Sequence, residues 1–221
     1  MKYGYACINT VLHSSKYGIE YASELALQNI TDLFEVIKWN QKHDISFYRM
    51  SSDMFPWMSE YELEDLPDYE KITTILLKIG SFVKLHNHRI SFHSGPFNIL
   101  ASPKRNVVLN AVKEIDKHSQ IMNLMNLDES PFFKINIHIG GVYKDKTDSL
   151  KRWCDNFSLL STSSKKRLTI ENDDKPNCYT VEDLLYVHHQ LNIPIVIDYH
   201  HHFCNSNNVP LEDSAKLAFS T

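Results

Sequence analysis

The 221-residue sequence lacks the features that mark membrane, secreted or disulfide-stabilised proteins. No apolar run approaches the roughly 18 uncharged residues of a membrane span. The apolar run at the N-terminus is too short and too interrupted for a secretory signal. The four cysteines are scattered without a CxxC pair, which argues against a disulfide framework and against a thiolate zinc site. We therefore expect a soluble, intracellular protein with reduced cysteines and no membrane partner.

Glycine is also scarce, with only six residues, and no GxGxxG or GxxxxGK loop follows any β-rich run. This absence argues against the common phosphate-binding loops. The formal net charge of -4 argues against nonspecific coating of nucleic acid, although it allows a local basic patch beside an acidic, metal-binding centre. The 43% hydrophobic fraction and the chain length suit one globular domain over residues 1–221.

Short β-rich runs alternate with longer helical patterns along the whole chain. The β-rich runs cover residues 2–8, 45–50, 89–94, 132–138, 167–171 and 193–198. The helical patterns cover residues 20–42, 70–87, 104–127, 146–162 and 180–191, and a last helix begins near Pro210. Repeated β-then-α units predict a parallel sheet with right-handed crossovers. Without a glycine-rich loop, the α/β fold that they favour is a TIM-type (β/α) barrel.

Each of the six β-rich runs ends in, or just before, a polar side chain. In chain order these residues are Asn9, Arg49, His93, His138, Glu171 and Asp198. The active sites of barrels are built at the carboxyl ends of the strands. A single polar residue there is usually a cap or a solvated loop residue, but six at one rim favour a functional site.

The types of residue at this rim suit metal ions. Imidazole and carboxylate groups without cysteine are typical of a catalytic metal site rather than a structural one. Asp198 and His201 are three residues apart just beyond a strand, and Glu171 could bridge two ions. Two or three divalent ions about 3.5 to 4 Å apart can support phosphodiester hydrolysis. We predict Glu171, Asp198 and His201 as catalytic residues. The remaining histidines that lie in or beside helices are interpreted as surface or interhelical residues: His86, His88, His118, His188 and His189.

Several basic residues follow strands on the same face and could hold phosphates. They are Lys104, Arg105, Lys144 and Lys146, and two glycines in HIGGVYKDK would let backbone approach a phosphate closely. The basic run 165–167 precedes its strand, so we expect it to be a solvated edge at the opposite end of the barrel.

Six motifs, in this order, resemble those of the UV damage endonucleases, a family of metal-dependent DNA repair enzymes with a TIM-barrel fold. The motifs are GYACIN (4–9), YRMSSDMFPW (48–57), HSGPFNILASP (93–103), INIHIGGVYKDK (135–146), RLTIENDD (167–174) and IPIVIDYHHH (193–202). The ENDD and DYHHH elements are the most specific. The resemblance implies nicking of double-stranded DNA on the 5′ side of UV photoproducts, by a monomer with two or three Mn²⁺ ions, or with Zn²⁺ or Mg²⁺ instead.

The resemblance also implies roles for individual residues. The metal ligands would be His93, His138, Glu171, Asp198 and His201. Tyr5 and Asn9 would lie in the lesion-binding groove, and the residues after HSG would probe the duplex where damage weakens stacking.

The chain departs from the family pattern at three places. Pro96 and Phe97 stand where the family usually has glutamine and an aromatic residue; Phe97 can stack, but Pro96 cannot make the hydrogen bonds of an amide. Glu60 stands near the position of a family histidine and could replace it as a ligand. The family continues into two further strands, so the barrel is expected to lack strands seven and eight and to be incomplete at its C-terminus.

Two alternatives to the endonuclease remain open. One is a module that binds damaged DNA without cutting it, because the last ligands of the family are missing. The other is a different metal-dependent barrel enzyme, such as an abasic-site endonuclease or a sugar isomerase.

Overall fold

The computed structural model describes residues 2–6 and 18–221, so Cys7 and Asn9 lie outside the described residues. The chain divides into two compact units. The first comprises residues 1–93 and 117–134, and the second comprises residues 94–116 and 135–221. Helix α3 (Arg105–Leu124) begins in the second unit and ends in the first.

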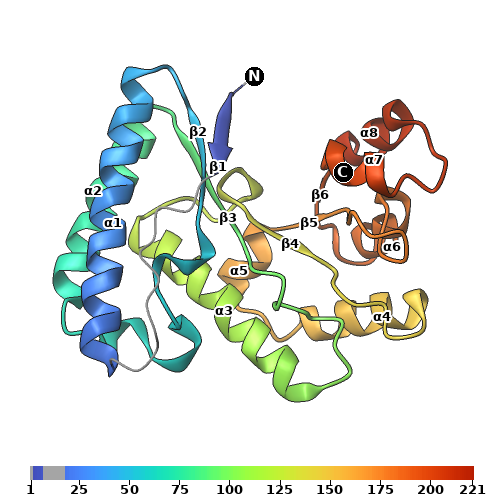
Figure 1. The fold of residues 1–221 in the computed structure, drawn as a ribbon, viewed down its shortest axis with the longest axis horizontal. Helices are drawn as coiled ribbons and strands as arrows, with labels where there is room; N and C mark the ends of the chain where they lie inside the picture. Colours follow the sequence, from blue (N-terminus) through green and yellow to red (C-terminus); the bar gives the residue numbers. More distant parts are fainter. Residues whose placement is uncertain (1, 7–17) are drawn as a thin grey trace. The chain divides into compact units, whose positions relative to one another are not determined.

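The first unit combines three parallel strands with two long helices (Figure 1). Its strands are β1 (Gly4–Ala6), β2 (Phe47–Met50) and β3 (Arg89–His93), hydrogen-bonded in this order. Helices α1 (Gly18–Lys42) and α2 (Tyr69–Leu85) pack against each other. The described residues of the unit also form short 3₁₀ segments: η2 (Ser52–Met54), η3 (Met58–Glu60), η4 (Leu63–Asp65) and η5 (Pro131–Phe133).

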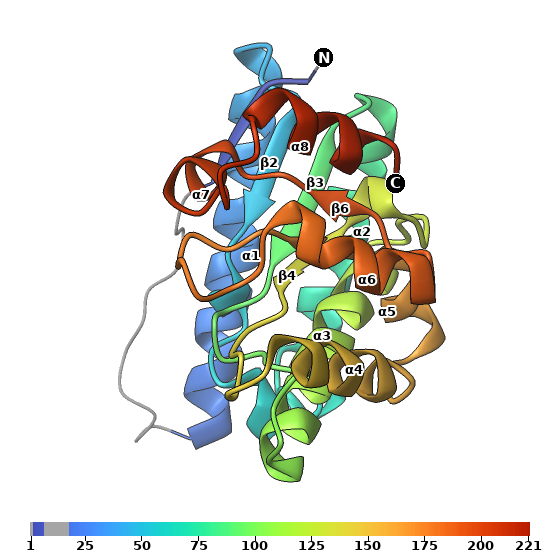
Figure 2. The ribbon, with the colours of Figure 1, turned by 90° about the vertical axis from the view of Figure 1, so that its right-hand side faces the viewer.

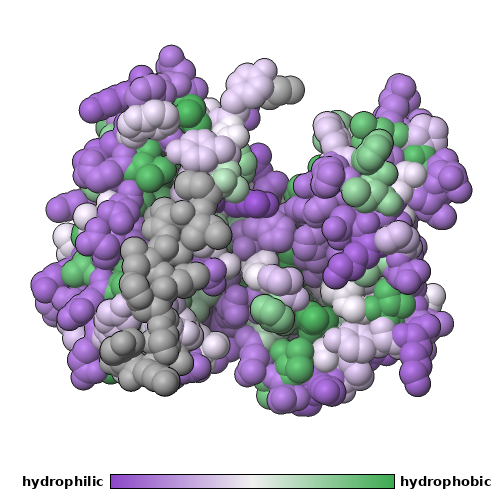
Figure 3. Space-filling view, in the orientation of Figure 1, coloured by the Kyte–Doolittle hydropathy of each residue, from purple (hydrophilic) through white to green (hydrophobic). Residues whose placement is uncertain are grey.

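The core of the first unit follows from apolar residues at helical spacing. Fully buried side chains recur along one stripe of each helix and along the two inner strands: Ile30, Leu33, Ile37, Leu76, Ile79, Val83, Tyr48, Met50, Ile90 and Phe92. Hydrophilic residues predominate where the outer surface of α1 and α2 is seen in Figure 3. Gly80 allows a close approach, because a Cβ atom there would lie 1.8 Å from the carbonyl oxygen of Met125.

The second unit also has three parallel strands. They are β4 (Ile135–His138), β5 (Leu168–Glu171) and β6 (Ile195–Val196), in this order. The other helices are α4 (Lys146–Phe157), α5 (Thr162–Arg167), α6 (Val181–Leu191), α7 (Tyr199–Cys204) and α8 (Leu211–Phe219). Helix α6 contacts both α4 and α8, as Figure 2 shows. A capping box of Thr180 and Asp183 starts α6, and Asn192 with φ 55° ends it.

The six parallel strands and the α/β fold class agree with the prediction from the sequence. The boundaries of several elements differ, and β6 covers only Ile195–Val196 of the run 193–198. Pro131 begins the 3₁₀ segment η5, so β4 starts only at Ile135. The pattern at 146–162 forms two helices, α4 and α5, because Ser161 caps a new helix with its side chain. Helix α7 was not predicted.

Two predictions about burial are wrong. Arg167 is not at a solvated edge: it is fully buried directly before β5, and its guanidinium donates a hydrogen bond to Ser163 Oγ. His118 is not at the surface: its fully buried ring lies 4.4 Å, centroid to centroid, from that of Phe92 on β3. In the described part of the chain, no helix has the length and apolarity to cross a membrane.

Candidate metal centre

Strands β4, β5 and β6 of the second unit bring four of the predicted site residues together. His138 is the last residue of β4 and pairs in register with Glu171, the last residue of β5. Asp198 follows β6 and caps the N-terminus of α7, which carries His201. Because parallel strands end at the same edge of a sheet, side chains distant in sequence meet there.

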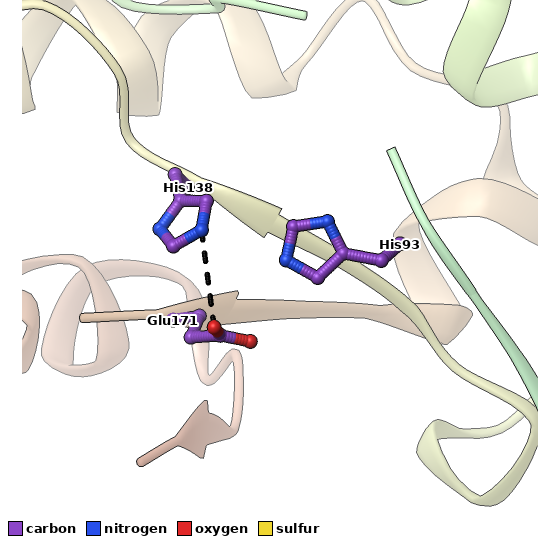
Figure 4. Close-up of side chains that lie close together, drawn as sticks. All are labelled: His93, His138 and Glu171. Atoms are coloured by element: carbon purple, nitrogen blue, oxygen red, sulfur yellow. Dashed lines mark ion pairs between the residues drawn. The ribbon is translucent and has the colours of Figure 1, made fainter. Parts of the chain in front are cut away.

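Glu171 is the centre of this cluster. Its side chain is almost fully buried, and its Oε1 atom lies 3.8 Å from His138 Nε2, along the dashed line in Figure 4, and 3.4 Å from His201 Nδ1. His201 Nε2 lies 3.9 Å from Asp198 Oδ2. Glu171, Asp198 and His201 each offer one ligand atom, and these atoms all lie within 4.8 Å of one another. Such a spacing suits ligands that surround one ion at about 2.0 to 2.2 Å each.

A buried polar network orients the Glu171 carboxylate. Asn136 on β4 donates a hydrogen bond from Nδ2 to Glu171 Oε2. The Asn136 Oδ1 atom in turn accepts a hydrogen bond of 2.7 Å from Thr169 Oγ1. All three side chains are buried, so this network replaces the hydration that the carboxylate loses.

Asn172 fixes the position of Asp198 and His201. Its side-chain amide pairs with the Asp198 backbone: Oδ1 accepts from Asp198 N at 2.8 Å, and Nδ2 donates to Asp198 O at 3.1 Å. The Asn172 carbonyl lies 2.8 Å from His201 Nδ1 and accepts its hydrogen bond. This bond places the proton of a neutral His201 on Nδ1 and leaves the lone pair of Nε2 free to bind a metal.

Asp173 contacts the cluster although its role was not predicted from the sequence. Its Oδ1 atom lies 3.3 Å from His138 Nδ1, and its side chain is only 13% exposed. Burial raises the pKa of Asp173 to about 6, against the opposing effects of a hydrogen bond with the Tyr179 backbone and of His201. The only signal in the sequence was its place two residues after Glu171 within ENDD.

Three predicted site residues, His93, Glu60 and Tyr5, belong to the first unit. His93, also drawn in Figure 4, ends β3 and directly precedes Ser94, whose N–H donates to Asn136 O at 3.1 Å. Glu60 is the exposed last residue of η3 and is in none of the groups of candidate ligands found among residues 2–6 and 18–221. The Tyr5 hydroxyl donates a hydrogen bond of 2.8 Å to Asn40 Oδ1.

The predicted DNA-probing residues, Pro96 and Phe97, are exposed in the second unit. Phe97 is 85% exposed, an unusual fraction for a phenylalanine. The loop that carries it is anchored by two hydrogen bonds directly after its tip. Asn98 Nδ2 donates to Glu114 Oε1 at 2.5 Å, and Asn156 Nδ2 donates to Leu100 O at 2.9 Å. The aromatic ring is therefore presented on a fixed base.

The predicted phosphate-binding lysines have different surroundings. Lys104 and Lys144 are exposed. Lys146 is half-buried and forms an ion pair of 2.7 Å with Asp183 Oδ2, which offsets part of its charge. Lys104 and Lys144 are consequently better placed than Lys146 to contact phosphates.

The donor set of the cluster fits a divalent metal ion. Two imidazoles and two carboxylates offer nitrogen and oxygen atoms, and thiolates are absent from this set of four. Mn²⁺, Fe²⁺ and Zn²⁺ all accept such ligands. In this protein, parallel strands alternate with helices, and histidines and carboxylates lie where the strands end. These features assign the protein to the class of α/β barrel proteins with a candidate metal centre.

The UV-endonuclease UvdE family model matches residues 6–218, and the chain belongs to this family. The family resemblance read from the motifs is confirmed. The chain is 36% identical to the UV-damage endonuclease of Schizosaccharomyces pombe (strain 972 / ATCC 24843), over 90% of this chain and 36% of that protein. It is also 36% identical to the UV DNA damage endonuclease of Bacillus mycoides (strain KBAB4), over 89% of this chain and 61% of that protein. The chain thus spans less than two thirds of the length of these relatives.

Solved structures support the same fold. The whole chain superposes on the crystal structure of SacUVDE, with a TM-score of 0.90 and 31% sequence identity. The match covers 76% of the SacUVDE chain. The whole chain also superposes on D-psicose 3-epimerase from Clostridium cellulolyticum H10, with a TM-score of 0.63 but only 11% sequence identity. The match covers 70% of the epimerase chain. The second likeness shows the TIM-barrel type of fold alone, which is the predicted fold class.

Proposed function

We propose that this chain is a UV-damage endonuclease that nicks double-stranded DNA on the 5′ side of a photoproduct by metal-dependent hydrolysis. The observation that carries the proposal is the group of Glu171, Asp198 and His201, whose ligand atoms lie within 4.8 Å of one another. The group occurs in a chain of the UvdE family, whose matched relatives are named as UV-damage endonucleases.

We propose that the protein holds two or three divalent ions, Mn²⁺ in the first place, with Zn²⁺ or Mg²⁺ as alternatives. The proposed ligands are His93, His138, Glu171, Asp198, His201 and Glu60. When bound, such ions lower the pKa of water and stabilise the charge on the leaving oxygen. The Glu171 carboxylate, held by Asn136, would present one oxygen to each of two ions. Asp198 and His201, held by Asn172, would fix a second side of the site.

Other side chains would select and hold the damaged duplex. Phe97 would insert where a photoproduct weakens base stacking, because its anchored loop keeps the ring exposed. Pro96 would stiffen the tip of the loop. Lys104 and Lys144 would contact phosphates, with a smaller contribution from Lys146 because of its ion pair with Asp183. Tyr5 and Asn9 would line the lesion groove, and we propose that residues 1–221 act as one monomeric barrel domain.

A nicking assay tests the proposal. The chain is incubated with Mn²⁺ and a 5′-end-labelled duplex that contains one cyclobutane dimer. We expect one product that ends directly 5′ of the dimer, no cleavage of the undamaged duplex, and no product when EDTA is added. Asp198→Asn is the matched inactive control, because it removes a ligand charge and keeps the shape. A chain that binds Mn²⁺ and damaged DNA but leaves the backbone intact would contradict the proposal.

That last outcome would favour a second candidate function, the recognition of damaged DNA without cleavage. The observation in its favour is the exposed Phe97, whose ring could stack on a damaged base whether or not the backbone is cut. Elemental analysis separates the candidates. The endonuclease requires at least two tightly bound metal ions per chain, whereas fewer than two with intact binding to damaged DNA would indicate the binding module.

A further inference from the structure

We propose that Asp173 is a positioning residue, which holds the His138 ring so that one nitrogen faces Glu171 and the other is bound to the Asp173 carboxylate. This inference rests on the proposed function, because it assumes that the cluster binds a metal ion. Asp173 would act through His138 and would not itself contact the ion.

The geometry around His138 carries the inference. The ring lies between two carboxylates, with Nε2 3.8 Å from Glu171 Oε1 and Nδ1 3.3 Å from Asp173 Oδ1. A neutral imidazole has one N–H donor and one lone pair, and an ionised carboxylate only accepts hydrogen bonds. Asp173 Oδ1 is the nearer of the two acceptors, so we infer that the proton lies on Nδ1, although the two groups are in contact without the alignment of a hydrogen bond. The lone pair of Nε2 then faces Glu171, which is the orientation that a metal ligand requires.

The backbone of Asp173 is held on both of its polar groups, so its carboxylate has a defined position. Its N–H donates to Tyr179 O at 2.8 Å, and its carbonyl accepts from Asn205 Nδ2 at 3.2 Å. A flexible acidic loop would offer the ring no fixed acceptor. The next residue, Asp174, is exposed and provides a control of equal charge.

The arrangement favours an outer role for Asp173 over direct ligation. Within the described residues, Asp173 is a member of neither group whose ligand atoms converge within 4.8 Å. It contacts Nδ1 of His138, whereas Glu171 Oε1 contacts Nε2. Carboxylates that bind the far nitrogen of a ligand histidine raise its basicity and fix its orientation.

Metal affinity is the first test. Mn²⁺ is titrated into the intact chain and followed by the electron paramagnetic resonance of the free ion. We expect Asp173→Asn to weaken the affinity about 10-fold and Asp173→Ala to weaken it further toward 100-fold, with an unchanged number of ions. The asparagine keeps one acceptor oxygen, which explains the order. Asp174→Asn should bind Mn²⁺ like the wild type.

The tautomer of His138 is the second test, and a merely structural role would not change it. Long-range ¹H–¹⁵N spectra are recorded on metal-free, ¹⁵N-histidine-labelled protein, with the His138 signals assigned by their loss in His138→Gln. We expect the Nδ1–H form in the wild type and in Asp174→Asn, and a mixture of tautomers in Asp173→Ala. Circular dichroism of each variant verifies that it is folded.

Three outcomes would overturn the inference, and they differ in what they say of the proposed function. Unchanged Mn²⁺ affinity and unchanged tautomer in both Asp173 variants would refute the positioning role and leave the endonuclease proposal intact. Loss of one bound ion in Asp173→Asn would show direct ligation instead. A wild-type chain that binds no Mn²⁺ would refute both proposals.

Discussion

The ends of the strands differ between the two units of the molecule. Among the described residues of the first unit, β2 ends at the buried Met50, and β3 ends in a candidate ligand, His93. In the second unit, β4 and β5 end in His138 and Glu171, and Asp198 follows β6. Most of the candidate ligands are therefore in the second unit.

Buried polar groups also serve different purposes in the two units. In the first unit, Asn29 Nδ2 donates to Met54 O at 3.0 Å, a bond that joins α1 to η2. In the second unit, Asn136 and Asn172 hold the side chain or backbone of candidate ligands. Burying such groups at a site costs stability, and helices with apolar stripes elsewhere offset that cost. We therefore expect substitutions in the core of the first unit to change mainly stability, and substitutions at the site of the second unit to change mainly metal binding.

The largest expected effect is the loss of metal from Glu171→Gln in the second unit. We expect its Mn²⁺ affinity, measured by isothermal titration calorimetry, to fall more than about 100-fold, because even outer partners contribute about 10- to 100-fold. The Tm of the metal-free variant should stay equal or rise, because a buried charge is removed and Asn136 still finds an acceptor oxygen. A fall in Tm with wild-type affinity would reverse the roles assigned to the two units.

The converse substitution is Gly80→Ala in the first unit. A Cβ atom there would lie 1.8 Å from Met125 O, so we expect the free energy of unfolding to fall by about 3 kcal/mol. This overpacking exceeds the gain of about 1 kcal/mol in helix propensity. Urea denaturation measures the change, with the exposed Ser81→Ala on the same helix as control. Equal stability of the two variants would show that the close approach is not needed.

A pH effect is expected from His118 in the first unit. Burial lowers the pKa of His118 to about 4, so the unfolded chain takes up a proton between about pH 6.5 and pH 4 while the folded chain does not. The free energy of unfolding should therefore fall by about 2 kcal/mol between pH 7 and pH 5 from this group. His118→Phe should flatten the pH dependence in urea denaturation. An identical slope in the variant would assign it to other groups.

The smallest expected effect is on recognition, from Phe97→Ala in the second unit. We expect the preference for damaged over intact duplex to weaken by about 1 to 3 kcal/mol, the contribution of one stacking contact. Stability should hardly change, because the side chain is 85% exposed. Competition binding measures the preference, with the exposed Phe219→Ala of α8 as control. Equal preferences in both variants would leave Phe97 without a role in probing.

The sequence predicted the elements well where apolar periodicity was strong. The long stripes of α1 and α2, and the run that became β5, were placed within a few residues. Helix α7, with the sequence YHHHFC, was missed because six residues rich in histidine carry no helical period. The burial of Arg167 and His118 also could not be read, since burial depends on elements that are distant in sequence.

The candidate site could be predicted in part, because local sequence patterns reveal some of its residues and not others. His138, Glu171, Asp198 and His201 were recognisable because each stands at or just after the end of a β-rich run. Asn136, Asn172 and Asp173 were not, because their contribution lies in contacts between neighbouring strands and loops. Local patterns identify residues of the right chemistry, whereas the three-dimensional contacts reveal which residues hold them in place.

The measurement that tests the central claim most directly is anomalous diffraction from crystals soaked in Mn²⁺. We expect anomalous density at about 2.0 to 2.3 Å from atoms of Glu171, Asp198 and His201. Crystals that show these three side chains in the present arrangement, with no anomalous density between them at saturating Mn²⁺, would contradict it.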